Sequence, residues 1–102
     1  MTKLERLKIY EEATKKWGLV AQYDQCIEEM AELIVAINKY KRKSIYGEYK
    51  NRPEIEENII EELADVTMCI EQMRHFFGED KVEALLEIKL AKFKKQIDNV
   101  DN

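Results

Sequence analysis

Residues 25–33 read QCIEEMAEL, and the interpretation of the whole chain starts from this stretch. Its apolar residues recur at helical spacing, yet it also places Glu28, Glu29 and Glu32 within five positions. In a helix, Glu32 is an i,i+3 neighbour of Glu29 and an i,i+4 neighbour of Glu28, so the like charges repel. No lysine, arginine or histidine stands three or four residues from any of the three. The stretch therefore predicts a helix whose negative charge is balanced by groups that lie outside this helix.

A second acidic cluster follows at residues 61–65, which read EELAD. Its Glu62 and Asp65 also lack a basic residue three or four positions away. At about 100° of rotation per residue, Glu29 and Glu62 each lie roughly 80° from the centre of the apolar stripe of their own helix. Glu32 and Asp65 lie about 140–145° from the same centres. The two pairs thus hold equivalent positions, flanking the seam expected between antiparallel helices.

Other acids of the chain have basic partners at supportive spacing, such as Lys16 for Glu12 and Arg74 for Glu71. A solvated helix face is the simplest explanation of a single unpaired cluster, whereas two matched clusters favour a ligand site. Carboxylate oxygens suit a hard divalent cation, Mg²⁺ or Mn²⁺. A di-iron site is disfavoured because it uses Glu-x-x-His motifs, and the only histidine, His75, is far from both clusters.

The periodicity predicts a single all-α domain over residues 1–102. Helices are expected over 2–15, 19–42, 54–77 and 80–98, with a loop over 43–53. Thr2 is expected to cap the first helix, Gly18 to break it and Gly78 to end the third. Asp80, with Glu83 three residues on, predicts a capping box for the fourth. Short connections predict an antiparallel four-helix bundle.

Apolar stripes predict which helix faces are buried. The stripe of the second helix comprises Tyr23, Cys26, Ile27, Met30, Leu33, Ile34, Ile37 and Tyr40. That of the third comprises Ile59, Ile60, Leu63, Val66, Ile70, Met73 and Phe77. These stripes are wide for a thin bundle, which predicts self-association. Cys26 and Cys69 form neither a CxxC motif nor a zinc-ligand spacing and are expected to be buried thiols.

Composition excludes several classes of partner. A net charge of −4 and a pI near 5.1 argue against a nucleic-acid polymer. The longest apolar runs, about five residues, are too short to cross a bilayer, and the N-terminus lacks the apolar core of a signal peptide. The expected location is therefore the cytoplasm.

Hard cations held by carboxylates typically serve phosphate chemistry, which also needs positive side chains. Lys89 lies about 40–50° from the apolar centre of the fourth helix, inside its stripe, with Lys92 and Lys95 three and six residues further on. The alternative is that Lys89 simply extends along the edge of the bundle. Lys39, on the second helix, is a weaker candidate.

These residues resemble the motifs of a known family. The segments EMAE at 29–32 and ELAD at 62–65 resemble the ExxE…ExxD signature of the all-α nucleoside triphosphate pyrophosphohydrolases, the MazG-like superfamily. The closing segment KLAKFKK at 89–95 is similar to the basic last helix of that family. The resemblance covers about residues 17–97.

The resemblance implies a Mg²⁺-dependent hydrolysis of a (deoxy)nucleoside triphosphate between its α and β phosphates. The products would be the monophosphate and pyrophosphate, the role nucleotide-pool clearance, and the assembly a homodimer or homotetramer. The implied Mg²⁺ ligands are Glu29, Glu32, Glu62 and Asp65. The implied phosphate-binding residues are Lys89 and Lys92, with Lys95 as a further candidate.

Other residues are candidates for parts of this chemistry. A carboxylate not saturated by metal, Glu28 or Glu61, could orient or deprotonate the attacking water. Trp17, Tyr46 and Tyr49 have aromatic faces that can stack on a base, and Asn38 can hydrogen-bond to a base edge. The alternative function is a non-catalytic bundle that binds metal or nucleotide or serves in oligomerisation. A purely structural bundle is a third reading.

Overall fold

The structure, a computed structural model, describes residues 1–47 and 52–100. Within these ranges the chain forms helices and no strand, which confirms the all-α prediction. The elements are α1 (Lys3–Trp17), α2 (Leu19–Tyr40), a π-helical turn η1 (Lys41–Ile45), α3 (Arg52–Phe77) and α4 (Glu79–Val100). None of the described helices is both long and apolar enough to cross a membrane.

The chain divides into two compact units, Met1–Gln72 and Met73–Asn102, with the boundary inside α3. The second unit contains the last turn of α3 and all of α4. There the Arg74 guanidinium donates to the Glu79 carboxylate at 2.7 Å and also pairs with Glu83. An antiparallel arrangement of all four helices and self-association stay predictions.

Three of the predicted helix ends follow from local chemistry. The Glu5 backbone N–H donates to the Thr2 hydroxyl at 3.1 Å, and the Glu5 carboxylate accepts from the Thr2 N–H, so Thr2 caps α1 as expected. Gly18 ends α1 at φ 89° and ψ 161°, a region that is essentially reserved for glycine. Gly78, at φ 118°, follows α3 in the same way.

Two predicted boundaries are wrong. Helix α4 begins at Glu79, so Asp80 lies within its first turn rather than at the cap, and Glu83 pairs with Arg74. Helix α3 begins at Arg52 and not after Pro53. A proline is tolerated in the first helical turn, because a backbone N–H at that position would have no hydrogen-bond partner within the helix. The predicted loop over 43–53 is partly helical, since η1 runs to Ile45, and 48–51 lie outside the described residues.

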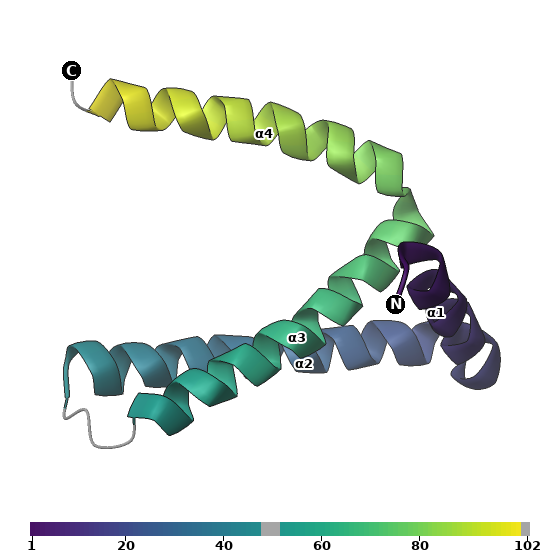
Figure 1. Cartoon of the computed structure of the whole chain (residues 1–102), viewed down its shortest axis with the longest axis horizontal. Helices are drawn as coiled ribbons and strands as arrows, with labels where there is room; N and C mark the ends of the chain where they lie inside the picture. Colours follow the sequence, from purple (N-terminus) through teal and green to yellow (C-terminus); the bar gives the residue numbers. More distant parts are fainter. Residues whose placement is uncertain (48–51, 101–102) are drawn as a thin grey trace. The chain divides into compact units, whose positions relative to one another are not determined.

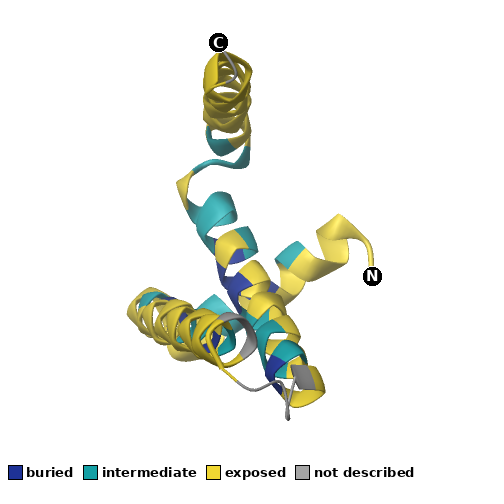
Figure 2. Ribbon diagram, turned by 90° about the vertical axis from the view of Figure 1, so that its left-hand side faces the viewer, coloured by how far each residue is buried: buried dark blue, intermediate teal, exposed yellow. Residues whose placement is uncertain are grey.

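The first unit is organised by the crossing of α2 and α3, with α1 beside both (Figure 1). Its buried apolar residues are Tyr10, Cys26, Ala36, Ile55, Val66 and Cys69. Figure 2 shows buried positions on the facing sides of α2 and α3. Both cysteines are free and buried, as predicted. The core is small, and little of it is strongly apolar.

Two buried glutamines link α2 to α3. The Gln72 amide donates to Oε1 of Gln22 at 3.2 Å, and the Cys26 thiol donates to Oε1 of Gln72 at 3.9 Å. Each glutamine is 8% exposed. Because buried amides are costly unless they are paired, this network helps to fix which residues of the two helices meet.

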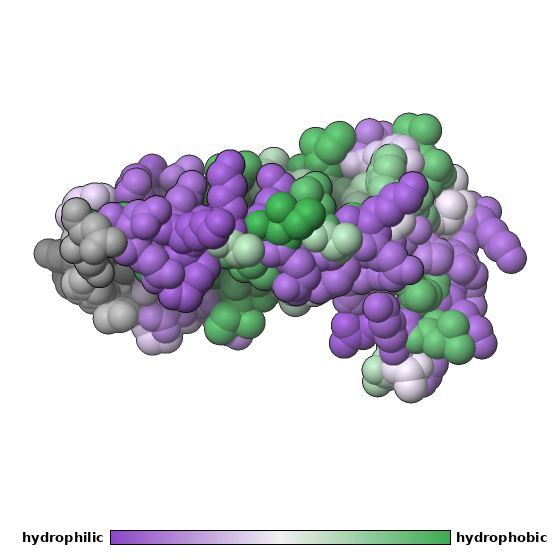
Figure 3. Space-filling view, turned by 90° about the horizontal axis from the view of Figure 1, so that it is seen from above, coloured by the Kyte–Doolittle hydropathy of each residue, from purple (hydrophilic) through white to green (hydrophobic). Residues whose placement is uncertain are grey.

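The faces of α2 and α3 that are buried in the first unit coincide only in part with the predicted apolar stripes. Cys26 and Val66 are buried as predicted, but several large members of the stripes are exposed. Ile27 and Ile34 on α2 are 67% and 61% exposed, and Ile60 on α3 is 66% exposed. Figure 3 shows apolar groups at the surface among hydrophilic ones. The helices instead meet through small or polar side chains such as Cys26 and Ala36, which allow the backbones to approach closely. Because the contact lies to one side of each stripe, Glu29 and Glu62 lie at the contact between the two helices.

The break at Gly18 gives a test of the fold. We expect Gly18→Ala to lower the free energy of unfolding by about 1–3 kcal/mol, because an L residue is strained at this φ and ψ. A Cβ built at Gly18 has no atom within 4 Å, so the loss would come from backbone strain and not from a clash. Urea denaturation measures the change. The control is Glu12→Ala, at an exposed position on α1. Equal stabilities of the two variants would contradict the backbone strain expected at position 18.

Candidate functional site

Three carboxylates from two helices converge in the first unit. Glu29 and Glu32 of α2 and Glu62 of α3 each offer an oxygen, and these oxygens lie within 4.8 Å of one another. We call these three residues the acidic triad. The structure thus brings together three of the four ligands expected from the two acidic clusters.

The buried faces of the helices carry the acidic triad into the contact. Glu29 lies three residues after buried Cys26 and seven before buried Ala36, so all three share one face of α2. Glu62 likewise precedes buried Val66 and Cys69 by four and seven residues on α3. Glu29 and Glu62 are therefore half-buried, whereas Glu32 is exposed at the rim.

The fourth expected ligand, Asp65, lies beside the triad. It is half-buried on α3, and its charge contributes to raising the pKa of both Glu29 and Glu62. The two candidates for water activation, Glu28 and Glu61, are both exposed. The charge of Glu28 contributes to raising the pKa of Glu32, and the charge of Glu61 contributes to raising the pKa of Glu62. The two acidic clusters predicted from the sequence therefore meet at one place.

The triad carboxyls all hold protons more tightly than usual. Burial is the largest cause, and it raises the pKa of Glu29, Glu32 and Glu62 above the ordinary 4.5. Neighbouring negative charge adds to it: Glu32 and Asp65 raise the pKa of Glu29, and Glu62 raises that of Glu32. A site that disfavours its own negative charge gains from a bound cation.

Two carboxylate oxygens of the triad lack any partner. Oε2 of Glu29 and Oε2 of Glu62 are buried, and within the described part of the chain neither has a hydrogen-bond partner. The other Glu29 oxygen accepts from the Gln25 amide at 2.7 Å. Buried unpaired oxygens are costly, and an all-oxygen donor set suits Mg²⁺ or Mn²⁺. The residues present therefore fit a hard divalent cation.

A pocket of about 360 Å³ opens beside the triad. It is lined by Glu28, Ala31, Glu32, Val35, Ala36, Asn58 and Glu62. The sequence suggested Asn38 as a polar contact for a ligand, but the amide in this pocket is that of Asn58. The signal that could have found Asn58 is its position four residues before Glu62, on the same face of α3.

The positively charged candidates are exposed. Lys39 lies on α2, in the same unit as the triad. Lys89, Lys92 and Lys95 lie on α4, in the second unit, and their approach to a phosphate group stays a prediction.

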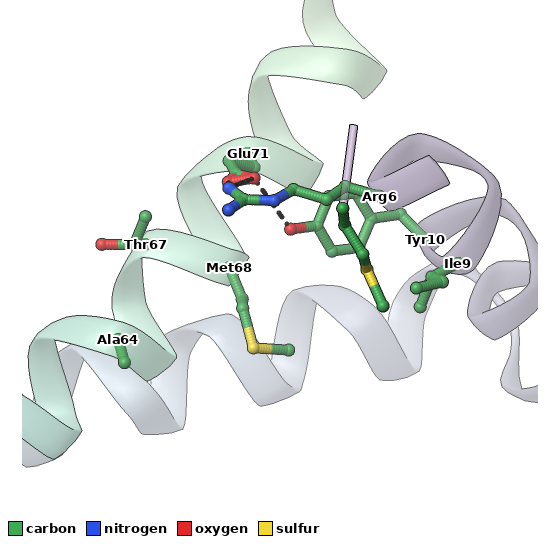
Figure 4. A pocket seen from close by; sticks show the side chains of 8 residues that line it. Arg6, Ile9, Tyr10, Ala64, Thr67, Met68 and Glu71 are labelled. Carbon is green, nitrogen blue, oxygen red and sulfur yellow. Dashed lines mark hydrogen bonds and ion pairs between the residues drawn. The ribbon is translucent and has the colours of Figure 1, made fainter. Parts of the chain in front are cut away.

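A larger pocket, of about 480 Å³, lies between α1 and α3 and contains none of the triad residues. Figure 4 shows Arg6 and Tyr10 of α1 pointing to Glu71 of α3. Arg6 pairs with Glu71 at 2.9 Å, so the predicted Glu71–Arg74 pair is wrong. Burial, and then the hydrogen bond donated to Glu71, raise the pKa of Tyr10. These groups satisfy one another and tie α1 to α3.

A third pocket, of about 310 Å³, is lined by Trp17, Ala21, Gln22 and Gln25. The Lys16 ammonium lies 5.0 Å from the centre of a Trp17 ring, a cation–π contact. Of the other aromatic candidates, Tyr46 is exposed, and Tyr49 lies outside the described residues.

Comparisons of the chain with models of protein families, with curated proteins and with solved structures find no match. What the site does must therefore follow from its residues and their geometry.

The raised pKa values predict how the metal-free protein responds to pH. Because the triad carboxyls bind protons more tightly folded than unfolded, their contribution to stability is fully present below pH 4.5 and is lost as the pH rises through the folded-state values. Without divalent cations at pH 7, we expect Glu32→Gln to raise Tm by roughly 2–4 °C. The gain should shrink toward pH 5, as measured by circular dichroism.

The matched control for this experiment is Glu12→Gln, an exposed acid on α1. Its Tm difference from the unchanged protein should not vary with pH in the same window. A Glu32→Gln gain that stays constant from pH 7 to pH 5 would contradict the electrostatic explanation.

Proposed function

We propose that this protein is a Mg²⁺-dependent nucleoside triphosphate pyrophosphohydrolase. It would hydrolyse a (deoxy)nucleoside triphosphate between the α and β phosphates, releasing the monophosphate and pyrophosphate. The observation that carries the proposal is the convergence of Glu29, Glu32 and Glu62 from two helices, with two buried oxygens unpaired. The MazG-like resemblance of the ExxE and ExxD segments supports the choice of reaction.

The triad and Asp65 would hold the cation. When bound, Mg²⁺ supplies positive charge that offsets the carboxylates and neutralises the phosphate oxygens of the substrate. The Gln25 amide keeps the Glu29 carboxylate in place by donating to one of its oxygens at 2.7 Å, leaving the other oxygen free for the metal. The site thus has a fixed half on α2 and a facing half on α3.

Glu28 is the better placed of the two candidates for activating water. It lines the pocket together with Glu32 and Glu62, whereas Glu61 is not among the lining residues. A carboxylate in this place can accept a proton from the attacking water and orient it toward the α phosphorus. Lys89, Lys92 and Lys95, with Lys39 as a weaker candidate, would contact the phosphates through their ammonium groups.

The proposal includes assembly into a homodimer or homotetramer. The first unit exposes large apolar side chains along one stripe of each long helix, including Ile27 and Ile34 on α2 and Ile60 and Leu63 on α3. Exposed apolar area of this kind is typical of an association surface.

The proposed reaction is tested by incubating the protein with Mg²⁺ and each common nucleoside and deoxynucleoside triphosphate. We expect ³¹P NMR to show pyrophosphate and a monophosphate in a one-to-one ratio. The double variant Glu32→Gln, Asp65→Asn should lose at least about 100-fold in kcat/KM, because two metal ligands are neutralised. Glu12→Gln, the exposed control, should keep its activity.

Two results would contradict the proposal. Full activity in the double variant would show that the ligand assignment is wrong. Mg²⁺ and nucleotide binding by calorimetry, without pyrophosphate release from any substrate, would instead support the non-catalytic binding module.

The assignment of the water-activating carboxylate gives a separate prediction. With Mg²⁺ saturating, we expect Glu28→Gln to lower kcat by about 10²–10⁴-fold with little change in Mg²⁺ affinity. Glu61→Gln is the matched comparison, and the factor by which it lowers kcat should be at least about tenfold smaller. The reverse order of the two kcat values would assign the water to Glu61.

A further inference from the structure

The pocket beside the acidic triad has walls of two chemical kinds. Its charged wall consists of Glu28, Glu32 and Glu62. Its uncharged lining residues, which we call the uncharged wall, are Ala31, Val35, Ala36 and Asn58. Of these, Val35 and Ala36 lie one turn beyond Glu32 on α2, and Asn58 lies one turn before Glu62 on α3. All of these residues come from α2 and α3 in the first unit.

We infer that the uncharged wall binds the nucleoside part of a nucleotide, and that the Asn58 amide hydrogen-bonds to it. This inference rests on the proposed function, because it takes the phosphates to be held at the triad. It adds a place for the sugar and base and a residue that discriminates among them, neither of which the acidic motifs specify.

Charge decides which part of a nucleotide can lie here. Among the described residues that line the pocket there is no lysine or arginine, and Glu28 adds negative charge. The carboxylate of Glu28 would therefore repel phosphate groups that lie beyond the reach of the cation. Sugar hydroxyls and base amino groups carry no charge, and they donate hydrogen bonds, which carboxylates accept. The pocket thus favours the uncharged end of the ligand.

The size of the pocket fits the same part of a nucleotide. A volume of about 360 Å³ falls in the lower range of small-molecule sites. Ala31 and Ala36 leave this space open because their side chains are single methyl groups. Ala36 is 2% exposed and forms a rigid part of the wall, whereas Ala31 is exposed at its edge.

Asn58 has the chemistry to read this ligand. Its carboxamide offers one acceptor and two donor hydrogens without adding charge to an acidic site. It is half-buried, one helical turn before Glu62, so a group bound at the triad lies next to it. A hydroxyl or a base edge can pair with such an amide in more than one way, which makes the residue a discriminating contact.

The pocket at Trp17 is the competing place for a base, and it is less well prepared. Lys16 already lies over the Trp17 ring at 5.0 Å. That pocket reaches the triad only through the bond from Gln25 to Glu29, whereas the proposed pocket contains two triad residues. The nucleoside is therefore placed on the Asn58 side.

Calorimetry on the intact chain tests the inference, with Mg²⁺ and the common nucleoside 5′-monophosphates as probes. For the tightest of these, we expect Asn58→Ala to weaken binding by about 3–10-fold, the value of one neutral hydrogen bond. Ala31→Leu, which fills the pocket from its exposed edge, should weaken it at least about tenfold. Both variants should bind Mn²⁺ and pyrophosphate like the unchanged protein. The controls, Asn99→Ala and Ala84→Leu, make the same changes at exposed positions on α4.

The possible failures are distinguishable. Unchanged monophosphate affinity in both pocket variants would overturn the inference and leave the proposed function standing. The same would follow if Trp17→Ala weakened binding and the two pocket variants did not. If the unchanged protein bound neither Mn²⁺ nor any nucleotide, the proposed function would fail, and the inference with it.

Discussion

The contact between α2 and α3 brings together groups that repel one another. Glu29 and Glu62 are half-buried there with Glu32 at the rim, and burial and mutual repulsion raise the pKa of all three. A helix pair selected for stability alone would place apolar side chains in this seam and acids outside. Here the acids share the seam with buried side chains such as Val66, whereas Ile27 and Ile34 lie exposed. Such an arrangement is typical of a site that trades stability for ligand binding.

The rest of the first unit holds this unfavourable contact in place. Buried Gln22 and Gln72 pair across the two helices, and small side chains at Cys26 and Ala36 let the helices approach. Next to Gln72 on α3, Glu71 pairs with Arg6 and fastens α1 to α3. None of these contacts relies on a large apolar core. The geometry of the triad therefore depends on a few polar pairs whose positions along the helices are specific.

Most of the local chemistry was predictable from the sequence, with the cap expected at Asp80 as an exception, whereas the long-range packing was predictable only where the two acidic clusters meet. The caps at Thr2 and the break at Gly18 depend on neighbouring residues, and the unpaired acids could be recognised from missing partners. The predicted stripe of α2 contains buried Cys26 but omits buried Ala36. Hydropathy favours large residues such as Ile27, whereas a small side chain is what permits the helices to cross closely. Partners such as Arg6 and Glu71, 65 positions apart, leave no local signal. Asn58 differs from the predicted amide, Asn38, because which of the two reaches the pocket depends on how α2 and α3 cross.

The buried thiols bear on which metals the site can accept. Burial, a hydrogen bond with Cys26 and the charges of Glu29 and Asp65 raise the pKa of Cys69 to about 12. At neutral pH this sulfur keeps its proton, and soft metals such as zinc or copper bind thiolates rather than thiols. Burial is the largest of these causes, and the acids that would attract a hard cation add to it, so they also disfavour the thiolate that a soft metal binds. Metal selectivity in this seam would then come from protonation as well as from the choice of ligands.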